Sequence, residues 1–138
     1  MSGILKLVVI AAVFLGASTL SAQEEKMDFD ANFSHVVYFW FHNPNNAEDR
    51  EAFETSLKKF LKNSEYAQTK FIGVPAETPR DVVDNSYTYS LILTFPSKEI
   101  QDKYQSEPAH KVFIKESSHL WKKVQVYDSV GIDKLAGE

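Results

Sequence analysis

The chain has 138 residues and a formal net charge of −4, with apolar residues at 43% and charged residues at 25%. This length predicts one domain, and the composition is close to the globular average, which excludes a disordered chain or a membrane bundle. Acidic and basic residues are interspersed, so we expect no nucleic-acid partner, and the lack of cysteine excludes disulfides and thiolate metal sites.

The first segment, residues 1–22, has the pattern of a signal peptide: a positive start, an apolar run from Leu7 to Leu15, and a small, polar end. A membrane anchor is the alternative, but a spanning helix needs about 20 apolar residues and this run is shorter. We therefore expect a secreted or periplasmic protein without a stable membrane anchor, cleaved near Ala22. Residues 23–32 would then form a polar leader.

The segment from Phe33 to His42 is dense in aromatic and β-branched residues, which predicts a strand. Both sets of alternating positions are apolar. A strand that carries helices on one side must then be covered on its other side as well. Val36, Tyr38 and Trp40 share one face, so they are candidates for a contact between two sheets.

A helix is predicted after this strand, because Asn46 can cap it and acidic residues occupy its first turn. Its apolar stripe has helical spacing and is formed by Phe53, Leu57, Phe60 and Leu61. We expect the helix to end near Asn63. A short second strand over Thr69 to Val74 and a loop from Pro75 to Ser86 follow.

The third predicted strand is Tyr87 to Phe95, in which tyrosine, leucine and phenylalanine alternate with threonine, serine and isoleucine. Ser97 can cap a short helix, and a second helix begins at Glu107-Pro108, where proline suits the first turn. The buried stripe expected for that second helix is Phe113, Ser117, Leu120, Trp121 and Val124. Val124 to Ser129 is the last predicted strand.

The predicted order β-α-β-β-α-(α)-β is the α+β, ferredoxin-like pattern, an antiparallel sheet with helices on one face. We expect this domain to span residues 33–130 and a tail to span 131–138. The uncovered face of the sheet is most economically buried against a second copy.

The sequence resembles the stress-responsive A/B barrel (Dabb) family over most of this domain. The resemblance rests on His35-Val36-Val37 followed by aromatic residues, on Gly73, on Tyr104 to His110 with its Y-x-x-x-P-x-H pattern, and on Val126-Tyr127-Asp128. It implies a homodimer in which two sheets pack into an α/β barrel, with a pocket between sheet and helices in each protomer.

One member of that family is a plant polyketide cyclase, and the residues matching Tyr104 and His110 are its working pair. The resemblance therefore implies catalytic roles for these two residues and a place in the pocket for His35. Tyr89 stands where the cyclase has another pocket histidine. The remaining aromatic candidates for the pocket are Phe39, Phe113 and Trp121, whose first expected role is to fill the core.

The chemistry of His110 allows two interpretations. A neutral imidazole can accept a proton at neutral pH while Tyr104 orients a substrate oxygen, or the histidine simply bonds to backbone at a helix start. His35 can likewise be a satisfied core group. The four histidines have no metal-binding spacing, so we expect no metal site.

Two functions from different classes follow. The first is a module that binds a small hydrophobic ligand in the pocket without turnover. The alternative is a cofactor-free lyase, cyclase or isomerase that uses His110 and Tyr104. Neither requires a cofactor, and the sequence contains no nucleotide-binding loop or catalytic triad motif.

Overall fold

The computed structural model describes residues 29–132, so the predicted signal peptide over residues 1–22 lies outside the described residues, as do most of the polar leader and of the C-terminal tail. The elements in chain order are β1 (Phe33–Phe41), α1 (Ala47–Asn63), β2 (Gln68–Gly73), β3 (Tyr89–Phe95), α2 (Lys98–Ser106), α3 (Pro108–Ser117) and β4 (Trp121–Val130). Within these residues no helix is long and apolar enough to cross a membrane.

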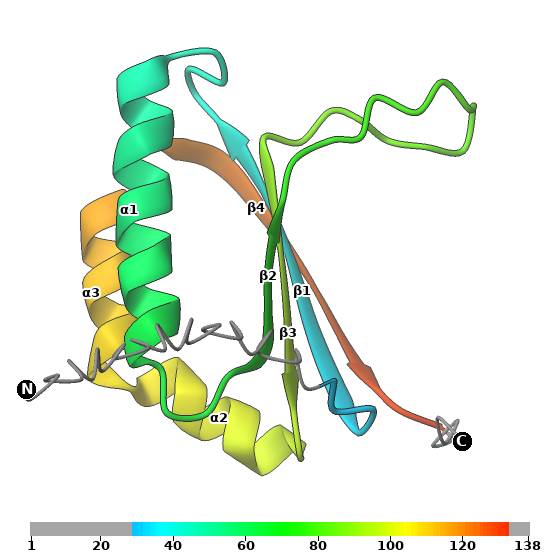
Figure 1. Cartoon of the computed structure of the whole chain (residues 1–138), viewed down its shortest axis with the longest axis vertical. Coiled ribbons are helices and arrows are strands. Elements are labelled where there is room, and N and C mark those ends of the chain that lie inside the picture. The colour runs from blue at the N-terminus through cyan, green and yellow to red at the C-terminus, as the bar shows by residue number, and fades with distance from the viewer. Residues whose placement is uncertain (1–28, 133–138) are drawn as a thin grey trace, which may run out of the picture.

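The four strands form one sheet in the order β2-β3-β1-β4, and all three neighbouring pairs are antiparallel. The three helices lie on one side of this sheet (Figure 1). This arrangement confirms the ferredoxin-like fold predicted from the order of elements.

The face that β1 turns toward the helices is set by its alternation. Every odd position of the strand is buried and every even position is half-buried. The buried positions are Phe33, His35, Val37, Phe39 and Phe41. Side chains of successive strand residues point to opposite faces, so these five meet the helices and fix the helix side of the sheet.

Both predicted helix caps are present. The Asn46 side chain accepts a hydrogen bond from the backbone N–H of Asp49 at 2.9 Å, and the Ser97 hydroxyl accepts one from the backbone N–H of Ile100 at 3.2 Å. Pro108 opens α3, where its missing N–H costs nothing. Local sequence therefore decides where these helices begin.

The boundary between α3 and β4 differs from the prediction. The helix ends at Ser117, and Trp121 and Val124 belong to β4, which begins at Trp121 instead of Val124. The physical reason is pairing with β1, because the Val124 backbone lies opposite Phe39 and the Trp121 backbone lies opposite Phe41. A short apolar run fits a helix or a strand equally well by its periodicity, so only the neighbouring strand decides.

The other boundaries shift by smaller amounts: β2 runs from Gln68 to Gly73 and β3 begins at Tyr89 instead of Tyr87.

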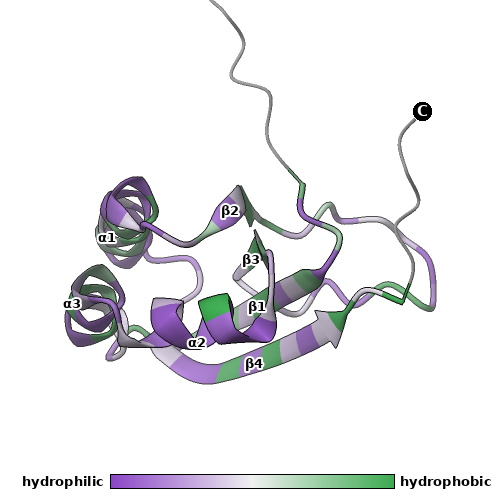
Figure 2. Ribbon diagram, turned by 90° about the horizontal axis from the view of Figure 1, so that it is seen from below, coloured by the Kyte–Doolittle hydropathy of each residue, from purple (hydrophilic) through white to green (hydrophobic). Residues whose placement is uncertain are grey.

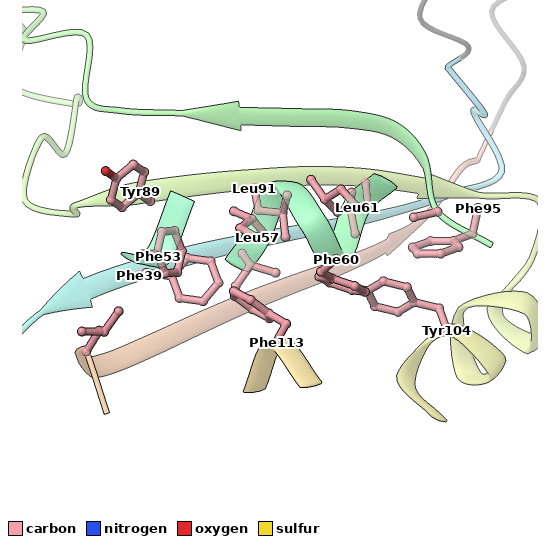
Figure 3. Close-up of a cluster of buried hydrophobic side chains, with 14 of the residues drawn as sticks. Phe39, Phe53, Leu57, Phe60, Leu61, Tyr89, Leu91, Phe95, Tyr104 and Phe113 are labelled. Atoms are coloured by element: carbon pink, nitrogen blue, oxygen red, sulfur yellow. The ribbon is translucent and has the colours of Figure 1, made fainter. Parts of the chain in front are cut away.

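The core between sheet and helices is rich in aromatic rings (Figure 3). Phe60 of α1 stacks on Phe113 of α3 with ring centroids 5.4 Å apart, which joins the two helices. They lie side by side in both views (Figures 1 and 2).

The opposite face of the sheet carries aromatic side chains without a covering layer in the described chain. Tyr38 contacts Trp40, Tyr87 and Tyr127, with ring centroids 4.8 to 6.4 Å apart. The indole N–H of Trp40 donates to the Ser86 hydroxyl at 3.0 Å. Tyr127 remains 59% exposed, so this face is available for a partner.

Candidate functional site

A cavity of about 290 Å³ lies between the helix side of the sheet and the helices α2 and α3. Its lining residues come from β1, β3, β4 and these two helices, and they are His35, Val37, Phe39, Leu91, Tyr104, Gln105, His110, Phe113, Ile114, Trp121, Val124 and Val126. The three aliphatic residues Ile114, Val124 and Val126 are partly exposed, which places the opening between α3 and β4. In Figure 2, β4 alternates between hydrophilic and hydrophobic residues, as expected for a strand with one face toward this cavity.

The polar part of the lining is a group of three rings, which we call the ring triplet: His35, Tyr104 and His110. The Tyr104 ring lies between the two imidazoles, 5.7 Å from His35 and 5.0 Å from His110, measured between centroids. Together with Gln105 and Trp121, these residues carry the hydrogen-bonding groups of an otherwise apolar wall. The cavity thus combines a large apolar surface with a concentrated polar site.

Tyr104 is held by the core. Its side chain is 1% exposed, and its ring packs against Phe60 and Phe95 with centroids 5.5 and 5.0 Å away. Among the described residues its hydroxyl has no hydrogen-bond partner, yet it is not among the atoms sealed from solvent, so it can reach a molecule in the cavity. Burial, and then the carboxylates of Glu107 and Asp128, raise the pKa of Tyr104 far above its ordinary value. The hydroxyl therefore stays protonated and acts as a donor.

His110 occupies the first turn of α3 and turns one ring nitrogen back to the chain. Its Nδ1 lies 3.1 Å from the carbonyl oxygen of Gln105, and because a carbonyl only accepts, Nδ1 carries the hydrogen. Burial lowers the pKa of His110, and the nearby charge of His35 adds to this effect. At neutral pH the imidazole is therefore uncharged, with a lone pair on Nε2.

His35 is 4% exposed and pairs with Asp128 on the neighbouring strand. The Nδ1 of His35 lies 2.6 Å from Oδ1 of Asp128, while the Asp128 side chain is 44% exposed at the edge of the sheet. A carboxylate oxygen accepts this hydrogen bond, so Nδ1 is again the protonated nitrogen. Both histidines of the triplet are thus oriented by an oxygen acceptor behind them.

Glu107 lies behind the triplet, outside the cavity. Its side chain is 7% exposed, and Oε2 accepts a hydrogen bond from the backbone N–H of Glu65 at 3.2 Å. Oε1 has no partner in the described chain. The residue lines a separate, wider groove of about 760 Å³ where α1 ends beside α2 and α3. Its charge influences Tyr104 and His110 from a distance, and its side chain does not line the cavity.

Residues 33–130 match the Stress responsive A/B Barrel Domain, Dabb. The chain belongs to the Dabb family. This match confirms the family that the sequence resembles. No curated protein sequence matches the chain significantly.

Solved structures share the Dabb fold at low sequence identity. A Dabb family protein with a ferredoxin-like fold from Mesorhizobium loti is 18% identical, with a TM-score of 0.61 and coverage of 73% of this chain and 97% of that one. A dimeric ferredoxin-like protein of unknown function from Thermobifida fusca is 12% identical, with a TM-score of 0.60 and coverage of 72% and 90%. The hydroxynitrile lyase from Passiflora edulis is 14% identical, with a TM-score of 0.62 and coverage of 74% and 94%. At these identities the likeness shows the fold alone.

Six of the seven residues predicted for the site of this Dabb protein lie around the one cavity: His35, Phe39, Tyr104, His110, Phe113 and Trp121. Their roles in binding or catalysis remain predictions. Tyr104 and His110 come together because α2 ends at Ser106 and α3 begins two residues later, which folds the chain back on itself.

Tyr89, predicted to bind ligand, does not line the cavity. Its ring stacks on Phe53 at 4.7 Å, and its hydroxyl donates to Glu54 at 2.7 Å. In Figure 3, Tyr89 and Tyr104 lie at opposite ends of the buried cluster. The reason is that Phe53 of α1 lies against both Phe39 and Tyr89 and fills the space between Tyr89 and the cavity.

Several lining residues were not predicted: Val37, Leu91, Gln105, Ile114, Val124 and Val126. Asp128 was also missed as a partner of His35. The signal that could have identified Asp128 is the register between β1 and β4, since residues opposite each other on antiparallel strands share a face. In the described part of the chain, no group of three His, Asp or Glu side chains could hold a metal ion.

Proposed function

We propose that this Dabb protein binds a small hydrophobic molecule that carries at least one oxygen function, and that the ring triplet recognises that oxygen. The observation that carries the proposal is the composition of the cavity wall, which is apolar except for the triplet, Gln105 and the indole N–H of Trp121. Ligand pockets commonly have this character, with a few placed polar groups that fix orientation. The volume of about 290 Å³ suits a ligand at the small end of the usual range.

A titration with two probes of nearly equal size tests this proposal. 2-Naphthol carries a hydroxyl that can bond to the triplet and naphthalene does not, so 2-naphthol should bind several-fold more tightly. The Val126→Trp variant should lose this binding, because the larger ring fills the cavity mouth. Val112→Trp, on a part of α3 that does not line the cavity, is the matched control. Equal affinity in wild type and Val126→Trp would contradict the proposal.

The second candidate is a cofactor-free lyase, cyclase or isomerase in which His110 and Tyr104 take part. A specific observation favours it: the Tyr104 hydroxyl is held protonated, while His110 is neutral with a lone pair on Nε2. Such a pair can donate a hydrogen bond to a substrate oxygen while a proton is removed nearby. The hydroxynitrile lyase from Passiflora edulis is an enzyme with a similar fold, which is compatible with this candidate.

The protein is also proposed to be exported and to act as a homodimer. Export rests on the signal-peptide pattern of residues 1–22 and predicts a mature chain that begins near Gln23. Mass spectrometry of the secreted or periplasmic form should find residues 1–22 removed. The homodimer is supported by the uncovered aromatic face of the sheet and by the dimeric relative from Thermobifida fusca.

A further inference from the structure

We propose that His35, held by Asp128, is the group that accepts a proton from a molecule bound in the cavity, and that Asp128 is its positioning residue. This inference rests on the proposal that the cavity binds a small molecule. It concerns which of the two imidazoles in the ring triplet receives the proton.

The first argument is geometric. His35 and Asp128 lie directly opposite each other on β1 and β4, and the 2.6 Å hydrogen bond between Nδ1 and Oδ1 fixes the ring. The hydrogen sits on Nδ1 because the carboxylate only accepts, so the lone pair of the neutral ring is on Nε2. Nε2 has no hydrogen-bond partner in residues 29–132 and is not among the sealed atoms. Since His35 lines the cavity, this nitrogen is open to a bound molecule.

The second argument is electrostatic. A histidine that takes a proton becomes a cation, and a buried cation needs a partner of opposite charge. His35 has the Asp128 carboxylate in direct contact, whereas the His110 side chain bonds to the neutral carbonyl of Gln105 in the described chain and the Glu107 carboxylate acts on it only from a distance. Charge on His35 also opposes charge on His110, which is why His35 contributes to the lowered pKa of His110. Of the two imidazoles in the triplet, His35 is therefore the one whose positive charge would have a counter-ion in direct contact.

The third ring of the triplet supplies the complementary group. Tyr104 packs edge-on against His35 with centroids 5.7 Å apart, and its protonated hydroxyl is free to donate. A substrate that loses a proton to His35 develops negative charge on an oxygen, which this hydroxyl can stabilise. His110 then remains neutral beside Tyr104 and serves to orient the bound molecule.

A probe reaction that needs only one base tests the assignment. In 5-nitrobenzisoxazole the C–H bond breaks, its proton goes to Nε2 of His35, and its electron pair forms the nitrile. The N–O bond breaks at the same time and leaves its electron pair on the oxygen, giving 2-cyano-4-nitrophenolate. The coloured product is measured by absorbance in the full-length protein. General-base help of this kind is worth about 10²–10⁴ in rate, so His35→Gln should lower kcat by about 10²-fold.

The other variants separate the roles. Asp128→Asn should lower kcat by about tenfold or more with KM little changed, because it removes the charge that stabilises the imidazolium and leaves the cavity intact. His110→Gln should lower kcat by less than His35→Gln does. His42→Gln, at an exposed position outside the cavity, is the control and should match wild type.

A spectroscopic measurement on wild type tests the protonation of His35 independently of the kinetics. Nitrogen-15 correlation spectra of the imidazoles at neutral pH should show His35 protonated at Nδ1, with a proton signal far downfield that disappears in Asp128→Asn. An unprotonated Nδ1 in wild type overturns the inference, as does a His110→Gln loss equal to that of His35→Gln. No conversion of the probe by a wild-type protein that binds 2-naphthol also overturns it and leaves the binding function standing. Conversion without 2-naphthol binding refutes the binding function instead.

Discussion

Tyr89 and Tyr104 are both buried tyrosines, yet their hydroxyls have different surroundings. Tyr89 donates its hydrogen to the Glu54 carboxylate, so its polar atom is already satisfied by the fold. Tyr104 has no such partner in the described chain, so its hydroxyl is available to a molecule in the cavity. A hydroxyl that has no protein partner and is not sealed from solvent can donate its hydrogen to a molecule in the cavity.

This contrast gives a matched pair of variants. Tyr104→Phe should weaken 2-naphthol binding about fivefold, corresponding to about 1 kcal/mol for one lost hydrogen bond. Tyr89→Phe should leave the affinity unchanged, because that hydroxyl faces Glu54. Calorimetric titration of both variants checks the difference. A similar loss in both would show that the effect comes from the core and has no connection with the cavity.

Tyr89 also predicts how stability depends on pH. Burial, followed by the bond to Glu54, raises the pKa of Tyr89 from 10.0 to about 12 in the folded protein. Folding therefore favours the neutral phenol, and this contribution is fully present below pH 10.0 and is lost as the pH rises to about 12. Urea unfolding across that window should show a steeper decline for wild type than for Tyr89→Phe, which has no hydroxyl to ionise. If the free energy of unfolding declined equally in both proteins, the ionisation of Tyr89 would make no contribution to the pH dependence.

At the scale of elements, the ends of the helices are set by single residues, and the ends of the strands by their neighbours. Asn46 and Ser97 satisfy backbone N–H groups that would otherwise lack partners, and both are visible as capping residues in the sequence. The start of β4 has no such local signal. It follows from pairing with β1, which extends to Trp121 opposite Phe41.

The capping role of Asn46 can be measured directly. Asn46→Ala should lower the free energy of unfolding by about 1 kcal/mol, because the N–H of Asp49 loses its acceptor. Asn46→Asp is the control, since its carboxylate can accept the same hydrogen bond and suits the positive helix end. Chemical denaturation of the three proteins gives the comparison. An alanine variant as stable as wild type would mean that water replaces the cap without cost.

At the scale of the whole molecule, residues 29–132 cover the sheet on one face only. The aromatic residues on its other face, Tyr38, Trp40, Tyr87 and Tyr127, form a continuous group of contacts. A soluble protein rarely leaves such a surface bare, and a two-fold dimer would pair the patch with itself. The proposed homodimer would therefore bury this aromatic face against the same face of a second copy.

Trp40→Asp should shift sedimentation from dimer to monomer, because it introduces a carboxylate into the aromatic face that forms the proposed interface. Val112→Asp, on the helix side of the protein, should leave the sedimentation unchanged. Sedimentation velocity at micromolar concentration distinguishes the two. A wild-type protein that is a monomer under these conditions would contradict the homodimer.

The sequence by itself determined the fold, because the alternation in β1, the two caps and the proline at α3 are local patterns that each permit few structures. It also predicted half of the residues that line the cavity, and the family pattern places Tyr104 and His110 at a tight turn between two helices.

Tertiary structure alone decided three further points: the exclusion of Tyr89, the start of β4 at Trp121, and the pairing of His35 with Asp128. Each depends on which residues from distant parts of the chain meet in space. Phe53 of α1 covers Tyr89, and the register of β4 against β1 brings Asp128 to His35 across 93 positions of sequence. Periodicity describes the faces of one element, and it contains no information on the register between two.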